Sequence, residues 1–212
     1  MVRTKLIILD FDKVLFYRAL TSKILNDMGG FQVKKYTYFP YPGVHDFLLD
    51  ICRKYKIGFF TSITEKNAKE ILETLLENTE VKYEFILDRR FVKLDPEYKS
   101  YRKLNEYDTI KLLSDVFNSP IVNHHRIYNK FNTIIIDDSY LKIRFNHPRN
   151  VILFDNVDMR SIIDKLGIDD VKEYNDDYNP NIKKINLNKR WDINEYTTLT
   201  SFSDILHHLE LV

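Results

Sequence analysis

The chain has 212 residues, of which 44% are hydrophobic, and a formal net charge of +1. This length and composition suit a single domain, 1–212, with a proper core, and they exclude an intrinsically disordered chain. The nearly neutral charge provides no global field that would attract nucleic acid or an anionic membrane. The single cysteine, Cys52, excludes a disulfide framework and a multi-cysteine zinc site.

The N-terminal residues weakly imitate a secretory signal. Arg3 and Lys5 precede an apolar run, but Asp10 and Asp12 interrupt that run too early, and no small-residue cleavage site follows. No stretch reaches the length of a transmembrane helix. We therefore expect an intracellular protein of the cytoplasm or nucleus, with no membrane partner.

The first apolar run, Leu6–Leu9, leads directly into Asp10 and Asp12. A short and partly β-branched run of this kind predicts a strand that is buried on both faces. Two like charges at the end of such a strand repel each other and lose hydration. A chain retains the pair most readily when a cation, or the transfer of an anionic group, requires it.

From Phe16 to residue 76 the pattern alternates between strands and helices, which implies a parallel sheet. The strand expected over 56–60 ends in Thr61 and Ser62 instead of acids. The expected elements are a polar, partly helical segment up to Gly29-Gly30, a flap strand over 31–39, a helix from Val44 to Cys52, the strand over 56–60 and a helix capped by Thr64.

Two polar or basic segments of the second half, about 78–107 and 169–195, are expected to be insertions into the sheet domain. A second buried run, over 132–136, delivers Asp137 and Asp138. The other expected elements are a strand over 83–87, a helix from Asp108 with Lys111 in its first turn, a strand over 150–154, a helix over 159–166, a strand over 182–187 and a helix over 203–211.

Polar side chains thus follow several parallel strands, and functional groups gather at the carboxyl ends of such strands. Carboxylates are the ligands that Mg²⁺ prefers, and a lysine with a hydroxyl can hold phosphoryl oxygens. Taken singly, these residues have ordinary explanations: an Asp after a strand is often a turn residue, Thr61 could cap a helix and Lys111 could lie on the surface. Two acid pairs after two buried runs favour the functional interpretation.

The motifs resemble those of the haloacid dehalogenase superfamily. Asp10–Leu15 resembles its first motif, DxDx(T/V)(L/V), Ile57–Thr61 its second and Ile134–Ser139 its fourth. The closer resemblance is to the FCP/SCP, or NLI-interacting factor-like, branch of C-terminal-domain phosphatases. That resemblance rests on the stretches 41–48, 60–68, 110–113 and 128–150. It implies an α/β fold with a Rossmann-like parallel sheet flanked by helices, and with a small β flap and short insertions instead of a large cap domain.

The resemblance also implies residue roles. Asp10 would be the nucleophile that forms an aspartyl-phosphate. Asp12 would protonate the leaving oxygen and then activate water. Thr61, Ser62 and Lys111 would hold the oxygens of the transferred phosphoryl group.

Mg²⁺ is the cofactor that the resemblance implies. It would bind Asp10, the main-chain carbonyl of Asp12, and Asp138, with Asp137 nearby through water or a lysine. The cation would offset the repulsion between a phosphate dianion and a carboxylate nucleophile.

Some positions depart from the family pattern and bear on substrate recognition: Lys13 for Glu, Tyr41 for Arg, Leu112 for Asp and Tyr140 for Pro. None of them removes a catalytic group. Lys130 and Lys93 are alternative candidates for the phosphate lysine, and Lys111 is favoured by its flanking residues.

The resulting hypothesis is a Mg²⁺-dependent phosphomonoester phosphatase whose partner is a phosphoserine or phosphothreonine protein, since no large cap closes the expected site. One alternative is a polynucleotide 3′-phosphatase on the same fold. The basic and aromatic 88–107 stretch suits nucleic acid, but the neutral charge of the chain does not favour it. A scaffold that binds a partner and turns nothing over is the other alternative.

Overall fold

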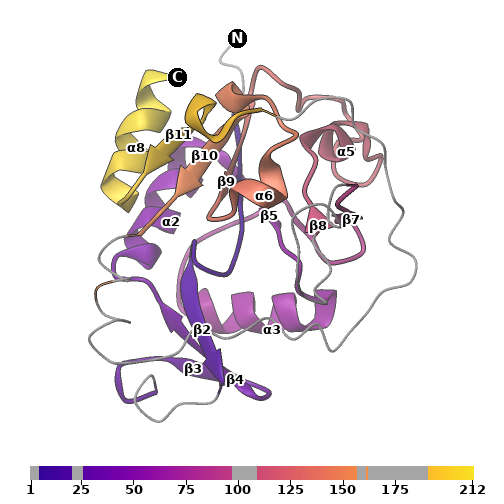
Figure 1. The fold of residues 1–212 in the computed structure, drawn as a ribbon. Coiled ribbons are helices and arrows are strands. Elements are labelled where there is room, and N and C mark those ends of the chain that lie inside the picture. The colour runs from indigo at the N-terminus through magenta and orange to yellow at the C-terminus, as the bar shows by residue number, and fades with distance from the viewer. Residues whose placement is uncertain (1–4, 21–25, 97–108, 157–160, 162–190) are drawn as a thin grey trace.

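The computed structural model describes residues 5–20, 26–96, 109–156, 161 and 191–212, and the statements below concern these residues. The strands of the central sheet are β1 (Leu6–Leu9), β5 (Lys56–Phe60), β6 (Phe85–Leu87), β9 (Thr133–Asp137), β10 (Val151–Phe154) and β11 (Thr197–Leu199). They pair in parallel in the order β11-β10-β9-β1-β5-β6 (Figure 1). The predicted α/β parallel sheet is confirmed.

Strand β1 lies in the middle of this sheet, and Leu9 is level with Phe59 of β5 and Ile136 of β9. All four of its residues are fully buried. Alternate residues of the strand join two hydrophobic clusters, one on each face of the sheet. The clusters contain α2 (Val44–Lys54), α3 (Glu65–Leu75) and α8 (Phe202–Leu211) on one face, and α5 (Leu113–Asn118) and α6 (Tyr140–Ile143) on the other.

A small antiparallel sheet lies between β1 and β5 in the sequence and forms the predicted flap. Its strands are β2 (Phe16–Leu20), β3 (Phe31–Val33) and β4 (Tyr36–Pro40), in the order β2-β4-β3. The segment up to Gly29-Gly30, predicted as partly helical, begins with β2, which pairs with β4 along its whole length, and is helical at Asn26 and Asp27. The prediction of one strand over 31–39 is wrong, because the chain turns at Lys34, whose φ of 55° lies in the left-handed region.

The segment before α5 is extended and not helical. Two short strands pair antiparallel there, β7 (Lys93–Leu94) and β8 (Thr109–Ile110). The predicted helix is therefore present only from Leu113 onward, as α5, and the prediction that Lys111 lies in its first turn is wrong. The main-chain N–H of Lys111 donates to the carbonyl of Lys142, at 2.7 Å, instead of to a helical carbonyl.

Two 3₁₀ turns, η1 (Pro148–Asn150) and η2 (Ile193–Glu195), precede β10 and β11. The sequence pattern missed β11, which is short and only partly buried. The predicted terminal helix is confirmed as α8. The predicted helix over 159–166, the strand over 182–187 and most of the 169–195 insertion lie outside the described residues. Within the described ranges, no helix combines the length and the apolar character needed to cross a membrane.

Candidate active site

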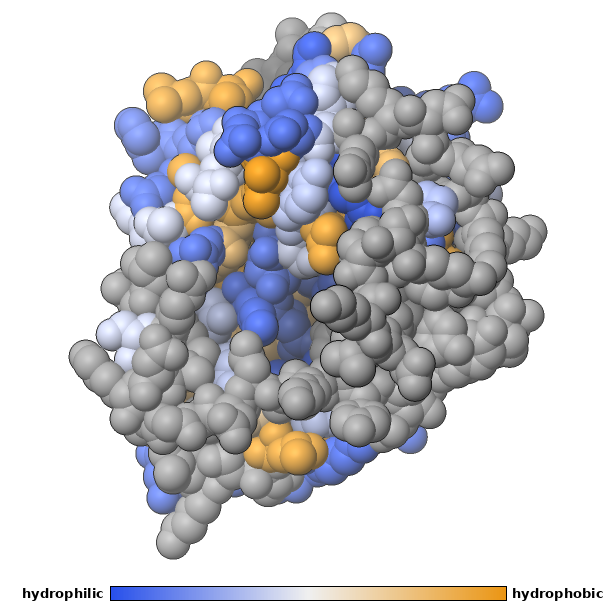
Figure 2. Space-filling model, viewed as in Figure 1, coloured by the Kyte–Doolittle hydropathy of each residue, from blue (hydrophilic) through white to orange (hydrophobic). Residues whose placement is uncertain are grey.

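Three neighbouring strands end at the same edge of the sheet and deliver polar side chains. Asp10 follows β1, Thr61 follows β5, and Asp137 is the last residue of β9. In Figure 2, hydrophilic residues line a recess near the middle of the face shown, between the sheet and the flap. The strand order thus assembles the predicted edge from segments that are far apart in the sequence.

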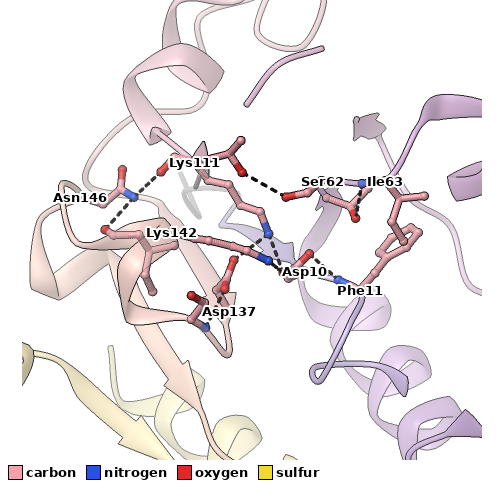
Figure 3. A network of polar contacts seen from close by, with 12 residues as sticks. Asp10, Phe11, Ser62, Ile63, Lys111, Asp137, Lys142 and Asn146 are labelled. Atoms are coloured by element: carbon pink, nitrogen blue, oxygen red, sulfur yellow. Dashed lines mark hydrogen bonds and ion pairs between the residues drawn. The ribbon is translucent and has the colours of Figure 1, made fainter. Parts of the chain in front are cut away.

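The Asp10 side chain is buried and held in one orientation. Its Oδ1 accepts a hydrogen bond from the main-chain N–H of Phe11, at 2.7 Å. Its Oδ2 lies 2.7 Å from the Nζ of Lys111 and 3.7 Å from the Nζ of Lys142 (Figure 3). Burial acts to raise the pKa of Asp10, but the charges of the two lysines outweigh it, so the pKa lies below its ordinary value. Asp10 is therefore a carboxylate.

Lys111 is the centre of the buried charge network. Its ammonium lies 2.7 Å from Oδ2 of Asp10 and donates a hydrogen bond to Oδ2 of Asp137, also at 2.7 Å. The side chain of Asn146 holds its main chain, because Nδ2 donates to the carbonyl of Lys111 at 2.7 Å and Oδ1 accepts from the N–H of Leu113 at 2.8 Å. The position of the lysine is thus set by β8 and α6 together.

Three carboxylates converge beside this lysine. Oxygen atoms of Asp10, Asp137 and Asp138 all lie within 4.8 Å of one another. Burial raises the pKa of Asp137, and it raises the pKa of Asp138 to about 7. The charge of Asp10 adds to both increases and that of Asp137 adds to the increase at Asp138, while Lys111 and Lys142 oppose them. Three carboxyls and two lysines thus meet at this edge.

This donor set fits a hard divalent cation. Carboxylate oxygens are the protein ligands of Mg²⁺, and a cation would relieve the repulsion that raises the pKa of Asp138. The side chain of Asp12 stands apart from the group, since its Oδ2 lies 3.1 Å from the guanidinium of Arg18 on β2. Arg18 also stacks over the ring of Tyr36, 5.0 Å from its centroid. Asp12 is therefore tied to the flap.

The hydroxyl residues after β5 form a tight turn. The buried Thr61 hydroxyl accepts a hydrogen bond from the N–H of Ile63, at 3.2 Å. The Ser62 hydroxyl lies 3.5 Å from that of Thr109. Nε of Arg89 donates to the Ser62 carbonyl at 2.9 Å, which fixes the turn against the segment after β6.

A sequence profile of the NLI interacting factor-like phosphatase family matches residues 5–160. The chain belongs to this family. The match spans all the elements that supply the site, from β1 to β10. It confirms the predicted FCP/SCP branch of the haloacid dehalogenase superfamily.

Two further comparisons report individual proteins to which the chain is similar. An uncharacterized FCP1 homology domain-containing protein of Schizosaccharomyces pombe is 29% identical over 157 residues, which cover 70% of this chain and 59% of that protein. Two structures of the fission yeast RNA polymerase II CTD phosphatase Fcp1, one of them bound to beryllium fluoride, match with a TM-score of 0.51 and 17% identity. They cover 72% of this chain, which spans 41% and 42% of theirs. At this identity the likeness concerns the fold.

The alternative lysines of this family member lie away from Asp10. Lys93 pairs with Asp115, with 2.6 Å between Nζ and Oδ1. Lys130 is exposed and stacks over the ring of Phe131. Of the three candidates, the structure brings Lys111 to the carboxylates.

Sequence reasoning missed three residues that shape the site: Arg18, Lys142 and Asn146. Lys142 and Asn146 fall in the 128–150 stretch that carries the family resemblance, and the position of Lys142, five residues after Asp137, was an available signal. Arg18 offered none, because its contact with Asp12 depends on the pairing of β2 with β4.

Proposed function

We propose that the protein is a Mg²⁺-dependent phosphomonoester phosphatase that works through an aspartyl-phosphate on Asp10. The observation that carries the proposal is the buried Asp10 carboxylate, held between Lys111 and a cluster of acids at the end of the central strand. The family to which the chain belongs supports the reaction class.

In the first step an oxygen of Asp10 attacks the phosphorus atom of the substrate and forms the acyl phosphate. The bond from phosphorus to the leaving oxygen breaks, and Asp12 gives that oxygen its proton. In the second step water attacks phosphorus, Asp12 takes the proton, and inorganic phosphate leaves. Asp10 returns as a carboxylate, so the cycle is balanced.

The cations of the site stabilise the transferred group. Lys111 and Lys142 lie on the same oxygen of Asp10, so both ammoniums are available to the equatorial phosphoryl oxygens as these approach. Thr61 and Ser62 add hydroxyls at the end of the neighbouring strand. The Arg18 guanidinium beside Asp12 fixes the direction in which the acid points.

Mg²⁺ would be held by Asp10, Asp138 and the main-chain carbonyl of Asp12, with Asp137 bound to Lys111 beside it. When bound, it supplies positive charge that lets a phosphate dianion approach a carboxylate. The convergence of three carboxyls within 4.8 Å of one another supports this assignment.

A phosphoserine or phosphothreonine side chain of a protein is the substrate that we propose. The short β2-β4-β3 flap stands where a large cap would close the site, and a peptide needs an open approach. The fission yeast structures are those of a phosphatase of the RNA polymerase II CTD, which is a protein substrate.

The experiment measures hydrolysis of p-nitrophenyl phosphate with Mg²⁺ and with EDTA, in the wild type and in Asp10→Asn. We expect turnover only in the wild type with Mg²⁺. When that reaction is stopped with acid, we expect to detect an acyl phosphate on Asp10. If the wild type shows no hydrolysis that Asp10→Asn abolishes, the phosphatase proposal fails and the non-catalytic scaffold is the function that remains. Phosphate release from a phosphoserine peptide and from a 3′-phosphorylated oligonucleotide, compared at equal concentration, then tests the substrate class.

A further inference from the structure

A second polar hollow lies at the opposite edge of the sheet from Asp10. It has a volume of about 330 Å³ and is formed by the residues where β1, β9 and β10 begin, by η1 and by the last turns of α8. The residues that matter for its chemistry are Lys5, Lys130, Phe131, Thr133, Arg149 and His208. Because parallel strands run from this edge to the catalytic edge, the hollow and the catalytic acids are separated by the length of the sheet.

The hollow concentrates positive charge in a chain that is nearly neutral overall. Lys5, Lys130 and Arg149 come from three separate segments, and His208 contributes a further basic group. Among the described residues that line the hollow, none has an acidic side chain. The side chains of Lys130 and Arg149 make no ion pair or hydrogen bond with the described part of the chain, and Lys130 only stacks over Phe131, 5.1 Å from its ring centroid.

The backbone that carries these cations is held firmly. Nδ2 of the buried Asn150 donates to the carbonyls of Lys130 and Thr133, at 2.8 and 2.7 Å. The side chain of Asn132 donates to the carbonyl of Ile127, at 2.8 Å. Lys5 donates to the carbonyl of Leu209 in α8, which fixes its ammonium beside the hollow. Lys130 and Lys5 are thus held by a pre-organised frame, which reduces the entropy cost of binding.

We propose that this hollow binds a phosphate group, as a second anion site that is independent of the catalytic centre. A guanidinium and two ammoniums from different directions match a tetrahedral dianion better than a single carboxylate, because each oxygen finds its own donor. The phosphate can belong to a phosphorylated protein or to a free anion such as pyrophosphate. The proposal concerns binding alone and does not depend on the proposed phosphatase activity.

The test is an NMR titration of the full chain with pyrophosphate in EDTA at constant ionic strength. We expect saturable shifts of the main-chain amides of Phe131, Thr133 and Arg149. The double variant Lys130→Ala/Arg149→Ala should bind at least about tenfold more weakly at these amides, since it loses two charge-assisted contacts to the phosphate. The matched control is Arg53→Ala/Lys66→Ala, which removes the same two charges from exposed positions on α2 and α3 and should bind like the wild type.

Three outcomes would overturn the proposal: shifts confined to the amides around Asp10, equal affinity in the double variant and its control, or equal shifts with acetate. The test follows main-chain amides of the hollow and no activity. It therefore stays valid even if the proposed phosphatase activity is disproved. A phosphoserine peptide that binds more tightly than pyrophosphate, with no binding of the unphosphorylated peptide, would identify the source as a protein. Binding of pyrophosphate alone would identify a free anion.

Discussion

The charge balance at individual residues determines what the catalytic edge can bind. Lys111 is fully buried and lies within 2.7 Å of both Asp10 and Asp137. Lys142 is only partly buried and lies 3.7 Å from Asp10, and its charge also acts to lower the pKa of Asp138. Burial acts to raise the pKa of all three carboxyls, but Lys111 and Lys142 outweigh it at Asp10, whereas burial and the charge of Asp10 prevail at Asp137 and Asp138.

Replacement of the central lysine should damage both folding and activity. Lys111→Met leaves Asp10 and Asp137 without their buried counter-charge, which should lower the free energy of unfolding by about 3–5 kcal/mol in EDTA at pH 7.5. The kcat should fall by about 10²–10³-fold, because in the proposed mechanism the lost ammonium would stabilise the transferred phosphoryl group. Urea unfolding and a phosphatase assay measure the two effects.

Lys93→Met is the matched control for that variant. Lys93 and Asp115 are each about 30% exposed, so their pair should contribute no more than about 1 kcal/mol. The kcat should stay at the wild-type value. A Lys111→Met protein as stable as Lys93→Met would contradict the buried network.

The raised pKa of Asp138 makes the stability of the metal-free protein depend on pH. Its folded-state pKa of about 7 lies above the value of about 3.9 in an unfolded chain. Between these values the folded state binds the extra proton, so the free energy of unfolding should decrease as pH rises, by up to about 1.4 kcal/mol per pH unit. Urea unfolding in EDTA from pH 4 to 8 measures this slope.

At pH 8 Mg²⁺ should restore the stability that is lost as pH rises from about 4 to about 7, because it replaces the proton on Asp138. In Asp138→Asn the decrease with pH should be smaller, and so should the stabilisation by Mg²⁺. An equal gain with Mg²⁺ in both proteins at pH 8 would show that the cation does not use this carboxyl.

At the scale of elements, one side chain connects β8, α5 and α6. Asn146 bonds the main chains of Lys111, Leu113 and Ile143 at once. Asn150 does the same at the opposite edge, where it bonds Lys130 and Thr133. The two buried asparagines therefore have equivalent roles in the fold, but only Asn146 lies at the edge of the sheet that carries Asp10.

This pair predicts a separation of stability from activity. Asn146→Leu and Asn150→Leu should each cost about 1–3 kcal/mol or more, because each leaves buried main-chain groups unpaired. Only Asn146→Leu should also lower kcat, since it releases the segment that positions Lys111. Denaturation curves measure the stability of both variants, and steady-state assays measure their kcat values. Equal kcat values in the two variants would contradict the role of Asn146 in positioning Lys111.

Close contact between two strands predicts a further effect. Gly58 of β5 is level with Phe85 of β6, and a Cβ at Gly58 would lie 2.3 Å from the Phe85 ring. Gly58→Ala should therefore destabilise the protein by about 1–3 kcal/mol through overpacking. Adding Phe85→Leu should recover part of that loss, and thermal unfolding of the single and double variants measures the coupling. Additive losses would contradict the contact.

For the whole molecule, the sequence predicted what depends on local pattern and missed what depends on distant contacts. The buried runs before Asp10 and Asp137 identified β1 and β9, because burial on both faces leaves a continuous apolar signal. The extended segment at Lys111 was predicted as helix, because β8 has only two residues and thus no periodicity. Arg18 acquires its contact with Asp12 only when the flap has formed. The family motif therefore identified Lys111 correctly, although the local structure predicted for its segment was wrong.

The sheet order also gives Asp10 and Lys111, the two residues to which we assign catalytic roles, different resistance to local opening. Strand β1 is bonded on both sides, so the amides that lead into Asp10 should exchange with deuterium only on global unfolding. Lys111 follows a strand of two residues with one partner, and its amides should exchange through smaller fluctuations. On heating, the lysine should therefore separate from the nucleophile before the sheet melts, so that inactivation precedes the loss of the fold.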